Sequence, residues 1–143
     1  MKKNTFGFSL FMAALLVMGL GSCASTKAVD SAHNSRNSLD WQGTYTGMIP
    51  AASAPGIDIR MTLNADETFQ LRYEYVDRAN STYNEAGSFT WDKTGNNITL
   101  DTKDTDGGLR YYKVGENTLT VLDIKGNVIT GDLADLYILK KLP

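Results

Sequence analysis

Few side chains in this sequence of 143 residues are of the types that hold a metal, act as a nucleophile or transfer a proton at neutral pH. The chain contains one cysteine, Cys23, and one histidine, His33. A disulfide needs two cysteines, and a structural zinc site needs about four Cys or His ligands. A serine triad needs a histidine held in a folded site. These counts exclude a disulfide framework, a Cys/His zinc site and a His-based triad within the chain.

Carboxylates occur in two close groups, Asp66 with Glu67 and Asp132 with Asp135. A glycosidase needs two carboxylates that face one cleft, with the pKa of one of them raised. Both groups lie in polar turn segments, where nothing desolvates a carboxyl group. The chain also lacks the G-x-S-x-G and G-x-x-x-x-G-K motifs of serine hydrolases and phosphate-binding loops. We therefore expect a protein that is not an enzyme.

Another acidic segment has some of the spacing of a calcium loop. Asp104, Asp106 and Gly107 match an EF-hand loop read from Thr102, but Lys113 stands where the loop needs glutamate. No helical pattern flanks the segment. The pattern favours a solvated hairpin tip, and we predict no metal site.

The N-terminus has the pattern of a secretory signal that ends at the cysteine. Lys2 and Lys3 precede an apolar run over residues 6–20, and Leu20-Gly21-Ser22-Cys23 resembles a bacterial lipobox. The resemblance implies cleavage after residue 22 and lipidation of Cys23. Several acyl chains hold a protein stably at a membrane. We predict a lipid-anchored protein of the bacterial envelope.

Residues 23–38 comprise the lipidated cysteine and a small, polar segment that we expect to be a flexible tether. His33 lies in it, where a solvated residue is expected rather than a ligand or a base. Ala24 follows the cysteine, and in enteric bacteria this residue type directs a lipoprotein to the outer membrane. The domain itself is expected over residues 39–143.

From residue 39 onward, apolar and polar residues alternate. Ile57, Ile59, Met61 and Leu63 alternate with polar residues, which is typical of a half-buried strand. The same analysis predicts further short strands, separated by Gly/Asn/Asp turns, at 44–49, 69–75, 85–91, 97–101, 109–114, 118–122, 128–130 and 136–140.

About eight short strands joined by hairpins predict an all-β fold, and we expect an antiparallel up-and-down β-barrel. A barrel of this size is filled by side chains or holds one small ligand. The aromatic residues of the predicted strands favour a filled core, although they could also line a pocket. They are Phe69, Tyr73, Tyr75, Phe89 and Trp91.

A series of short motifs runs along residues 39–141. They are Trp41–Gly47, Met48–Ile57, Leu63, Asp66, Thr68, Gly87–Trp91, Ile98–Leu100, Tyr111–Asn117, Leu119, Leu122–Asp123, Gly126–Asn127 and Tyr137–Lys140. Their order and spacing resemble the N-terminal domain of the NlpE family, lipoproteins linked to copper resistance and envelope stress. The resemblance implies a small antiparallel, lipocalin-like barrel, in agreement with the alternation.

The loop from Pro50 to Gly56 departs from that family. Where the family carries C-x-x-C, this sequence has Ala51 and Ala54. Two thiolates at that spacing could bind Cu(I) or form a redox-active disulfide, and a methyl group does neither. The family's thiol-dependent metal or redox role is therefore not expected here, and no cofactor is predicted. Pro50, Pro55 and Gly56 predict that the loop conformation is kept.

Two methionines, Met48 and Met61, remain as soft donors outside the signal segment. Thioethers bind Cu(I), but two methionines on separate strands more often fill a core.

Three functions fit these features. The first is a non-catalytic envelope lipoprotein that acts in envelope stress or copper-related sensing through contacts with a signalling protein. The second is a carrier of a small apolar ligand in the barrel. The third is a periplasmic inhibitor or adaptor whose binding loop contains Pro50, Ser53, Pro55 and Gly56. The net charge of -2 excludes a basic surface for nucleic acid.

Overall fold

The structure, a computed structural model, describes residues 33–103 and 108–143. The predicted signal peptide, Cys23, most of the predicted tether, and Asp104 and Asp106 of the acidic segment lie outside the described residues. No helix within the described residues is long and apolar enough to span a membrane.

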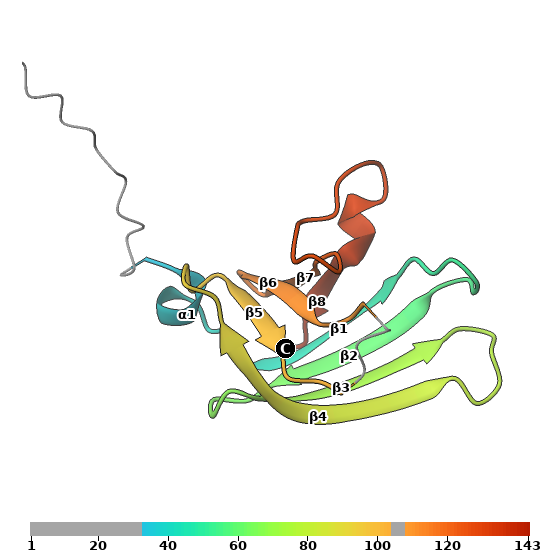
Figure 1. The fold of residues 1–143 in the computed structure, drawn as a ribbon, viewed down its shortest axis with the longest axis horizontal. Helices are drawn as coiled ribbons and strands as arrows, with labels where there is room; N and C mark the ends of the chain where they lie inside the picture. Colours follow the sequence, from blue (N-terminus) through green and yellow to red (C-terminus); the bar gives the residue numbers. More distant parts are fainter. Residues whose placement is uncertain (1–32, 104–107) are drawn as a thin grey trace, which may run out of the picture.

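Eight antiparallel strands form a closed barrel in which each strand pairs with the next and the last pairs with the first (Figure 1). Their bounds are β1 (Gly43–Ile49), β2 (Ile57–Leu63), β3 (Thr68–Tyr75), β4 (Thr82–Trp91), β5 (Asn97–Leu100), β6 (Tyr111–Gly115), β7 (Thr118–Val121) and β8 (Ile138–Lys141). The predicted all-β, up-and-down barrel is thus confirmed.

In β2 and β3, apolar residues that face the barrel interior alternate with polar residues that face outward. Ile59 lies opposite Tyr73 and Met61 opposite Leu71, and all four side chains are buried. Between them, Arg60 and the other polar residues face outward. Since a shift of one residue would expose the whole apolar set, the apolar pattern fixes the register.

The inward side chains fill the barrel. Tyr45, Tyr112, Phe69 and Phe89 are among the largest fully buried residues, and they pack in one apolar cluster with aliphatic residues from every strand except β4. Trp91 and Tyr75 are partly buried against this cluster. The filled core that the sequence favoured is what the structure shows.

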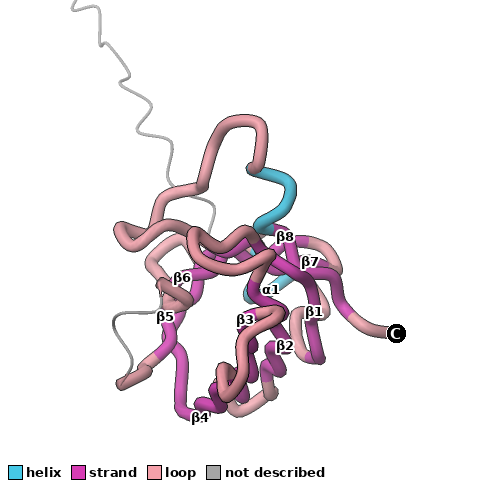
Figure 2. The backbone as a smooth tube through the Cα atoms, turned by 90° about the vertical axis from the view of Figure 1, so that its right-hand side faces the viewer, coloured by secondary structure: helices cyan, strands magenta, loops and turns pink. Residues whose placement is uncertain are grey.

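The up-and-down order places alternate connections at opposite ends of the barrel. The connections over 64–67, 92–96 and 116–117 lie at one end, which we call the α1 end. The connections over 50–56, 76–81 and 122–137, with residues 101–103 and 108–110 of the β5–β6 connection, lie at the other, which we call the distal end. Figure 2 shows the ring of strands with the β7–β8 connection above it.

The tether was predicted to extend to Ser38, and for its last residues this prediction was wrong. Residues 35–38 form a helical turn, α1 (Ser35–Ser38), whose N-cap is Asn34. Ser35 donates its amide to Asn96 Oδ1 at 3.0 Å, and Arg36 pairs with Glu67 at 2.8 Å. These contacts hold α1 at the end of the barrel, so the chain that precedes it enters there.

Residues 128–130 were predicted to form a strand, and this prediction was also wrong. Val128 makes one isolated bridge to Leu122, and its side chain is exposed. Because β7 already pairs with β6 on one side and with β8 on the other, residues 128–130 cannot extend the sheet beside it. The β7–β8 connection instead ends in a short 3-10 helix, η1 (Ala134–Tyr137), directly before β8.

Candidate functional site

The loop from Pro50 to Gly56 lies at the distal end between β1 and β2. Ala51 and Ala54 are half-buried, and Ala51 packs against the core cluster. Ser53 is exposed. The loop therefore offers two half-buried methyl groups and one exposed hydroxyl.

Gly56 fixes the return of this loop into β2. Its carbonyl oxygen accepts a hydrogen bond from the amide of Val76 at 3.0 Å, which ties the loop to the β3–β4 connection. A Cβ atom at this position would lie 2.8 Å from the Cγ of Met48. Pro50 is half-buried, and Pro55, which directly precedes Gly56, is exposed.

The two methionines do not come together. Met61 is fully buried in the barrel, whereas Met48 is 59% exposed on the outer face of β1. Their side chains therefore lie on opposite sides of the barrel wall and cannot share one ion. Among the residues the structure describes, no group of three or more His, Cys, Asp or Glu side chains is placed to hold a metal.

An apolar groove of about 290 Å³ runs beside the 50–56 loop. Pro50 and Ile57 line it from the β1–β2 side. Residues in and near the β5–β6 and β7–β8 connections also line it, among them Leu109, Leu122, Ile124, Ile129 and Tyr137. The altered family loop thus borders an apolar depression.

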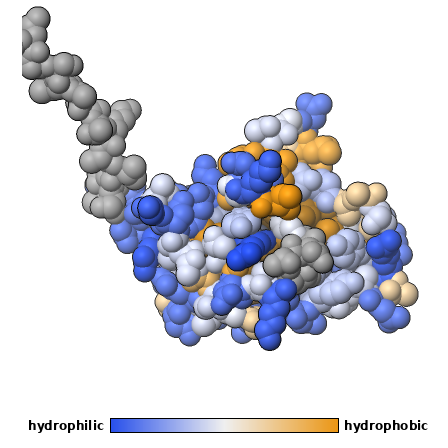
Figure 3. Space-filling view, viewed as in Figure 1, coloured by the Kyte–Doolittle hydropathy of each residue, from blue (hydrophilic) through white to orange (hydrophobic). Residues whose placement is uncertain are grey.

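Large apolar side chains are exposed along the β7–β8 connection next to this groove. Ile124 is 75% exposed, Leu133 55%, and Val128 and Leu136 51% each. We call these four side chains the distal surface. Figure 3 shows hydrophobic residues gathered over the upper part of the molecule, where this connection lies. An exposed apolar cluster of this kind is typical of an interaction site.

A second opening lies in the side wall between β4 and the residues that follow β5. It has a volume of about 700 Å³, and Tyr83, Glu85, Asp101 and Lys103 contribute to its lining. The Tyr83 ring stacks on the Tyr73 ring at 4.9 Å between centroids. The hydroxyl of Thr102 donates a hydrogen bond to the Glu85 carboxylate across the opening.

The buried hydroxyl of Tyr112 has no hydrogen-bond partner among the residues that the structure describes. Burial raises the pKa of Tyr112, and the negative charges of Glu85 and Tyr73 raise it further. The phenol therefore stays neutral at any physiological pH. It is a buried neutral group rather than an acid or a base.

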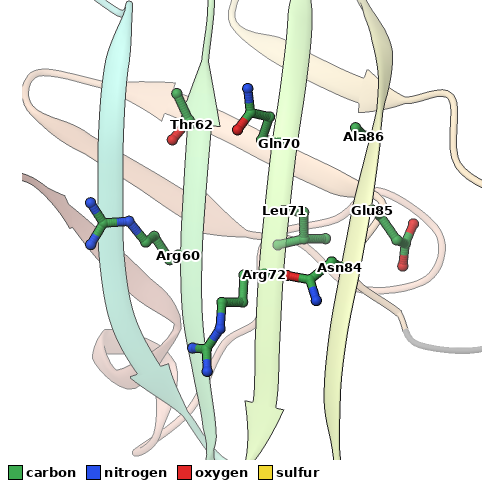
Figure 4. Close-up of a pocket in the computed structure, with 8 residues that line it drawn as sticks. All are labelled: Arg60, Thr62, Gln70, Leu71, Arg72, Asn84, Glu85 and Ala86. Atoms are coloured by element: carbon green, nitrogen blue, oxygen red, sulfur yellow. The ribbon is translucent and has the colours of Figure 1, made fainter.

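A third depression, of about 430 Å³, lies on the outer face of β2, β3 and β4 (Figure 4). Arg60, Gln70 and Asn84 are among its lining residues. The guanidinium of Arg72 pairs with Glu74 at 2.7 Å, and both side chains are exposed. Exposed ion pairs contribute little, so we treat this face as a solvated polar wall.

The predicted carboxylate groups are turn and surface residues. Asp66 accepts hydrogen bonds from the hydroxyl and the amide of Thr68, and these bonds hold the pKa of Asp66 below its ordinary value. Asp132 and Asp135 are exposed. Neither group forms a desolvated pair in a cleft.

The family model described as the NlpE N-terminal domain matches residues 45–132. The chain belongs to the NlpE N-terminal domain family. The matched span runs from within β1 into the β7–β8 connection, so it includes the loop that carries Ala51 and Ala54.

Comparisons with individual proteins agree with this membership. Lipoprotein NlpE of Escherichia coli (strain K12) is 26% identical over 120 residues, which are 82% of this chain and 50% of that protein. The chain therefore spans about half the length of this curated relative. A provisionally assigned lipoprotein of Shewanella oneidensis has a crystal structure with a TM-score of 0.67 and 48% identity, covering 76% of this chain and 94% of that chain.

A further solved structure, that of the Cpx pathway activator NlpE from Escherichia coli, has a TM-score of 0.49 and 24% identity. The likeness covers 63% of this chain and 46% of that chain.

Sequence reasoning located the 50–56 loop but not the surface around it. Ile124, Leu133 and Leu136 lie in a segment rich in Gly and Asp, without a regular period, and it was predicted as turns and short strands. Large apolar residues in such a segment were the available signal, because a turn seldom requires them. The side opening depends on where β5 stops pairing, which local alternation does not reveal.

Proposed function

We propose that this protein is a non-catalytic envelope lipoprotein of the NlpE type that acts in envelope stress sensing through a protein partner at its distal surface. The observation that carries the proposal is the exposed apolar cluster of Ile124, Val128, Leu133 and Leu136. It lies at the end of the barrel opposite α1. The lipobox of the sequence and the family membership support the envelope assignment.

The position of α1 fits a partner-binding site at the distal surface. The chain enters the barrel at the α1 end, so a lipid on Cys23 would hold that end toward the membrane, which we take to be the outer membrane. The distal surface would then face away from the lipid. A partner protein in the periplasm could reach it, and the half-buried Pro50 and exposed Ser53 would lie at its margin.

A thiol-dependent copper or redox role is not part of the proposal. Ala51 and Ala54 supply methyl groups at the two positions that would need thiolates, and Met48 and Met61 lie on opposite sides of the wall. The sensing we propose therefore runs through surface contacts. No observation favours a carrier function in the filled lumen.

An envelope-stress reporter in a bacterial host tests the proposal. We expect overproduction of the full chain to induce the reporter, and we expect Ile124→Asp with Leu136→Asp to abolish the induction. Lys93→Asp is the control, because Lys93 is exposed at the α1 end. An unresponsive reporter, or equal responses from the double variant and the native chain, would contradict the proposal. Cys23→Ala should release the protein from the membrane fraction.

A further inference from the structure

Among the described residues, no strand pairs with the first part of β4 on the side that faces β5. The amide of Phe89 donates to the carbonyl of Glu67 on the β3 side, at 2.9 Å. The next main-chain group along, the carbonyl of Ser88, accepts from the amide of Asp101 on the β5 side, at 2.8 Å. In an antiparallel ladder these directions alternate residue by residue.

By this alternation Thr82, Asn84 and Ala86 direct their N–H and C=O groups away from β3. The pairing of β4 with β5 covers only Phe89 to Trp91. Among the described residues, no strand pairs with β4 on that side before Ser88. Figure 1 shows β4 continuing well beyond the end of β5. Three alternate residues of β4, Thr82, Asn84 and Ala86, therefore present main-chain donors and acceptors to the side opening.

The sequence of this edge carries one of the usual protections. Natural sheets guard exposed edges with proline, lysine or an inward-pointing charge. Neither proline nor lysine occurs between Thr82 and Ser88. Glu85 is the one charge in that stretch, and it is of the inward-pointing kind, because it pairs with the buried Leu71 of β3 and so lies on the inner face of β4. A carboxylate there disfavours an apolar strand and favours a basic one.

The opening beside the edge has room and chemistry for an added strand. Its volume is about 700 Å³, and an added strand would take the place of the Thr102 hydroxyl beside the Glu85 carboxylate. The carboxylates of Glu85 and Asp101 outnumber the ammonium of Lys103 in its lining. Tyr83, which is 46% exposed, offers an aromatic surface two residues before Glu85. A cation beside Glu85 and an aromatic ring beside Tyr83 would both be matched.

We propose that the edge of β4 from Thr82 to Ala86 is a strand-addition site for an extended segment of a partner protein. The segment would carry a Lys or Arg opposite Glu85 and an aromatic residue opposite Tyr83. Main-chain hydrogen bonds supply the affinity of such a complex, and alternate side chains supply its specificity. The inference does not depend on the proposed function, because the distal surface lies over the β7–β8 connection and not on β4.

The probe is the blocked pentapeptide acetyl-Thr-Lys-Thr-Phe-Thr-amide, titrated by NMR into the purified full chain in detergent micelles. Paired antiparallel to β4, its central Thr directs its amide to Asn84, whereas its Lys directs its amide away from β4. We therefore expect N-methylation of the central Thr to weaken binding by about tenfold or more, and N-methylation of the Lys to have little effect. Equal affinities of the two methylated peptides, or no binding of the parent peptide, would overturn the proposal.

Proline at the edge provides the matched protein variants. Ala86→Pro removes one amide that faces the opening and leaves the β3 pairing intact, because proline is tolerated on an edge strand. Ala86→Ser keeps the amide. We expect about tenfold weaker binding for Ala86→Pro and an unchanged affinity for Ala86→Ser. If Ala86→Pro does not fold, Asn84→Pro makes the same test on the same edge.

A second copy of the chain is the competing occupant. Edge-to-edge pairing would make the protein dimerise with increasing concentration in the absence of peptide, and Ala86→Pro would abolish the dimer. That result would overturn the proposal. We expect a monomer whose Asn84 and Ala86 amides exchange rapidly with solvent and become protected when the peptide binds. Amides already protected in the monomer would contradict an open edge.

Discussion

The hydroxyl of Tyr45 donates a hydrogen bond to the carbonyl oxygen of Trp41 at 2.6 Å, from a side chain that is fully buried. Tyr112 is equally buried, but within residues 33–103 and 108–143 its hydroxyl has no hydrogen-bond partner. The two tyrosines thus differ in one hydrogen bond within the same apolar core. Their removal should separate the contribution of a satisfied buried hydroxyl from the cost of an unsatisfied one.

We expect Tyr45→Phe to lower the free energy of unfolding by about 1 kcal/mol, because a net hydrogen bond is lost and the Trp41 carbonyl loses its donor. Tyr112→Phe should leave it unchanged or raise it by about 1 kcal/mol, because an unpaired buried hydroxyl is removed. Urea unfolding of both variants measures the difference. Equal destabilisation by both substitutions would indicate that the hydroxyl of Tyr112 is bonded in solution.

The burial of Tyr45 and Tyr112 also predicts that the free energy of unfolding declines at alkaline pH. Burial raises the pKa of Tyr45 to about 12, with the charges of Asp40 and Glu116 adding to it, and burial raises that of Tyr112 as well. A raised folded-state pKa stabilises the fold below the ordinary value of 10.0, and the stabilisation is lost as pH rises above it. Tyr112→Phe should therefore reduce the slope of unfolding free energy against pH above that value, as urea titrations at several alkaline pH values would measure.

The docking of α1 depends on Gly95. Its φ is +70°, and a Cβ atom there would lie 2.6 Å from the side-chain amide of Asn34. The Gly95 carbonyl oxygen accepts a hydrogen bond from the amide of Arg36 at 2.9 Å. Gly108 has nearly the same φ, +69°, but among the described residues a Cβ atom there would meet only Ile124, at 3.8 Å.

Gly95→Ala should therefore cost about 1 kcal/mol more than Gly108→Ala, since both strain the backbone but only the first displaces the N-cap of α1. Urea unfolding gives the two costs. Hydrogen exchange at the Arg36 amide should quicken in Gly95→Ala alone. If the two glycines tolerate alanine equally, α1 does not need this close approach.

The β4–β5 turn is organised by one carboxylate. Burial raises the pKa of Asp92, but hydrogen bonds from Thr94, Asn97 and Asn96 outweigh it, so the pKa is lowered overall. A lowered folded-state pKa stabilises the fold above the ordinary value of 3.8, and this stabilisation is lost as pH falls. Asp92→Asn should destabilise the barrel at neutral pH by about 1 kcal/mol and flatten its acid dependence. Acid titration of the unfolding midpoint checks this, with Asp132→Asn as an exposed control.

The sequence predicted the barrel because most of its information is local. In β2 and β3 the alternation of Ile59 and Met61 with polar residues fixes both the strand and its inward face, and the turn that joins these two strands, residues 64–67, is short. Such features need no knowledge of distant partners. The strand at 128–130 failed for the opposite reason, because a strand forms only where an edge is free, and β7 and β8 already pair with each other.

The candidate surfaces were less accessible to sequence reasoning. The tether was extended to Ser38 because its residues are small and polar, and such residues also cap helices and bond turns, as Asn34 and Ser35 do. The exposure of Ile124 and Leu136 depends on which strands close the barrel. The metal-binding chemistry of the 50–56 loop, in contrast, could be assessed from two residue types in the sequence. The methyl side chains of Ala51 and Ala54 cannot bind a metal ion wherever they lie in the fold.

That loop permits a gain-of-function test. In a Cys23→Ser background, which removes the native thiol, Ala51→Cys with Ala54→Cys restores the family spacing at the distal end. Two thiolates two residues apart chelate a soft ion, so we expect the double variant to bind one Cu(I), as competition with a chromophoric chelator would show. Either single substitution should bind much more weakly, because one thiolate and distant thioethers make no chelate. Equal binding by the single and double variants would mean that other donors, such as Met48 beside Gly56, complete the site.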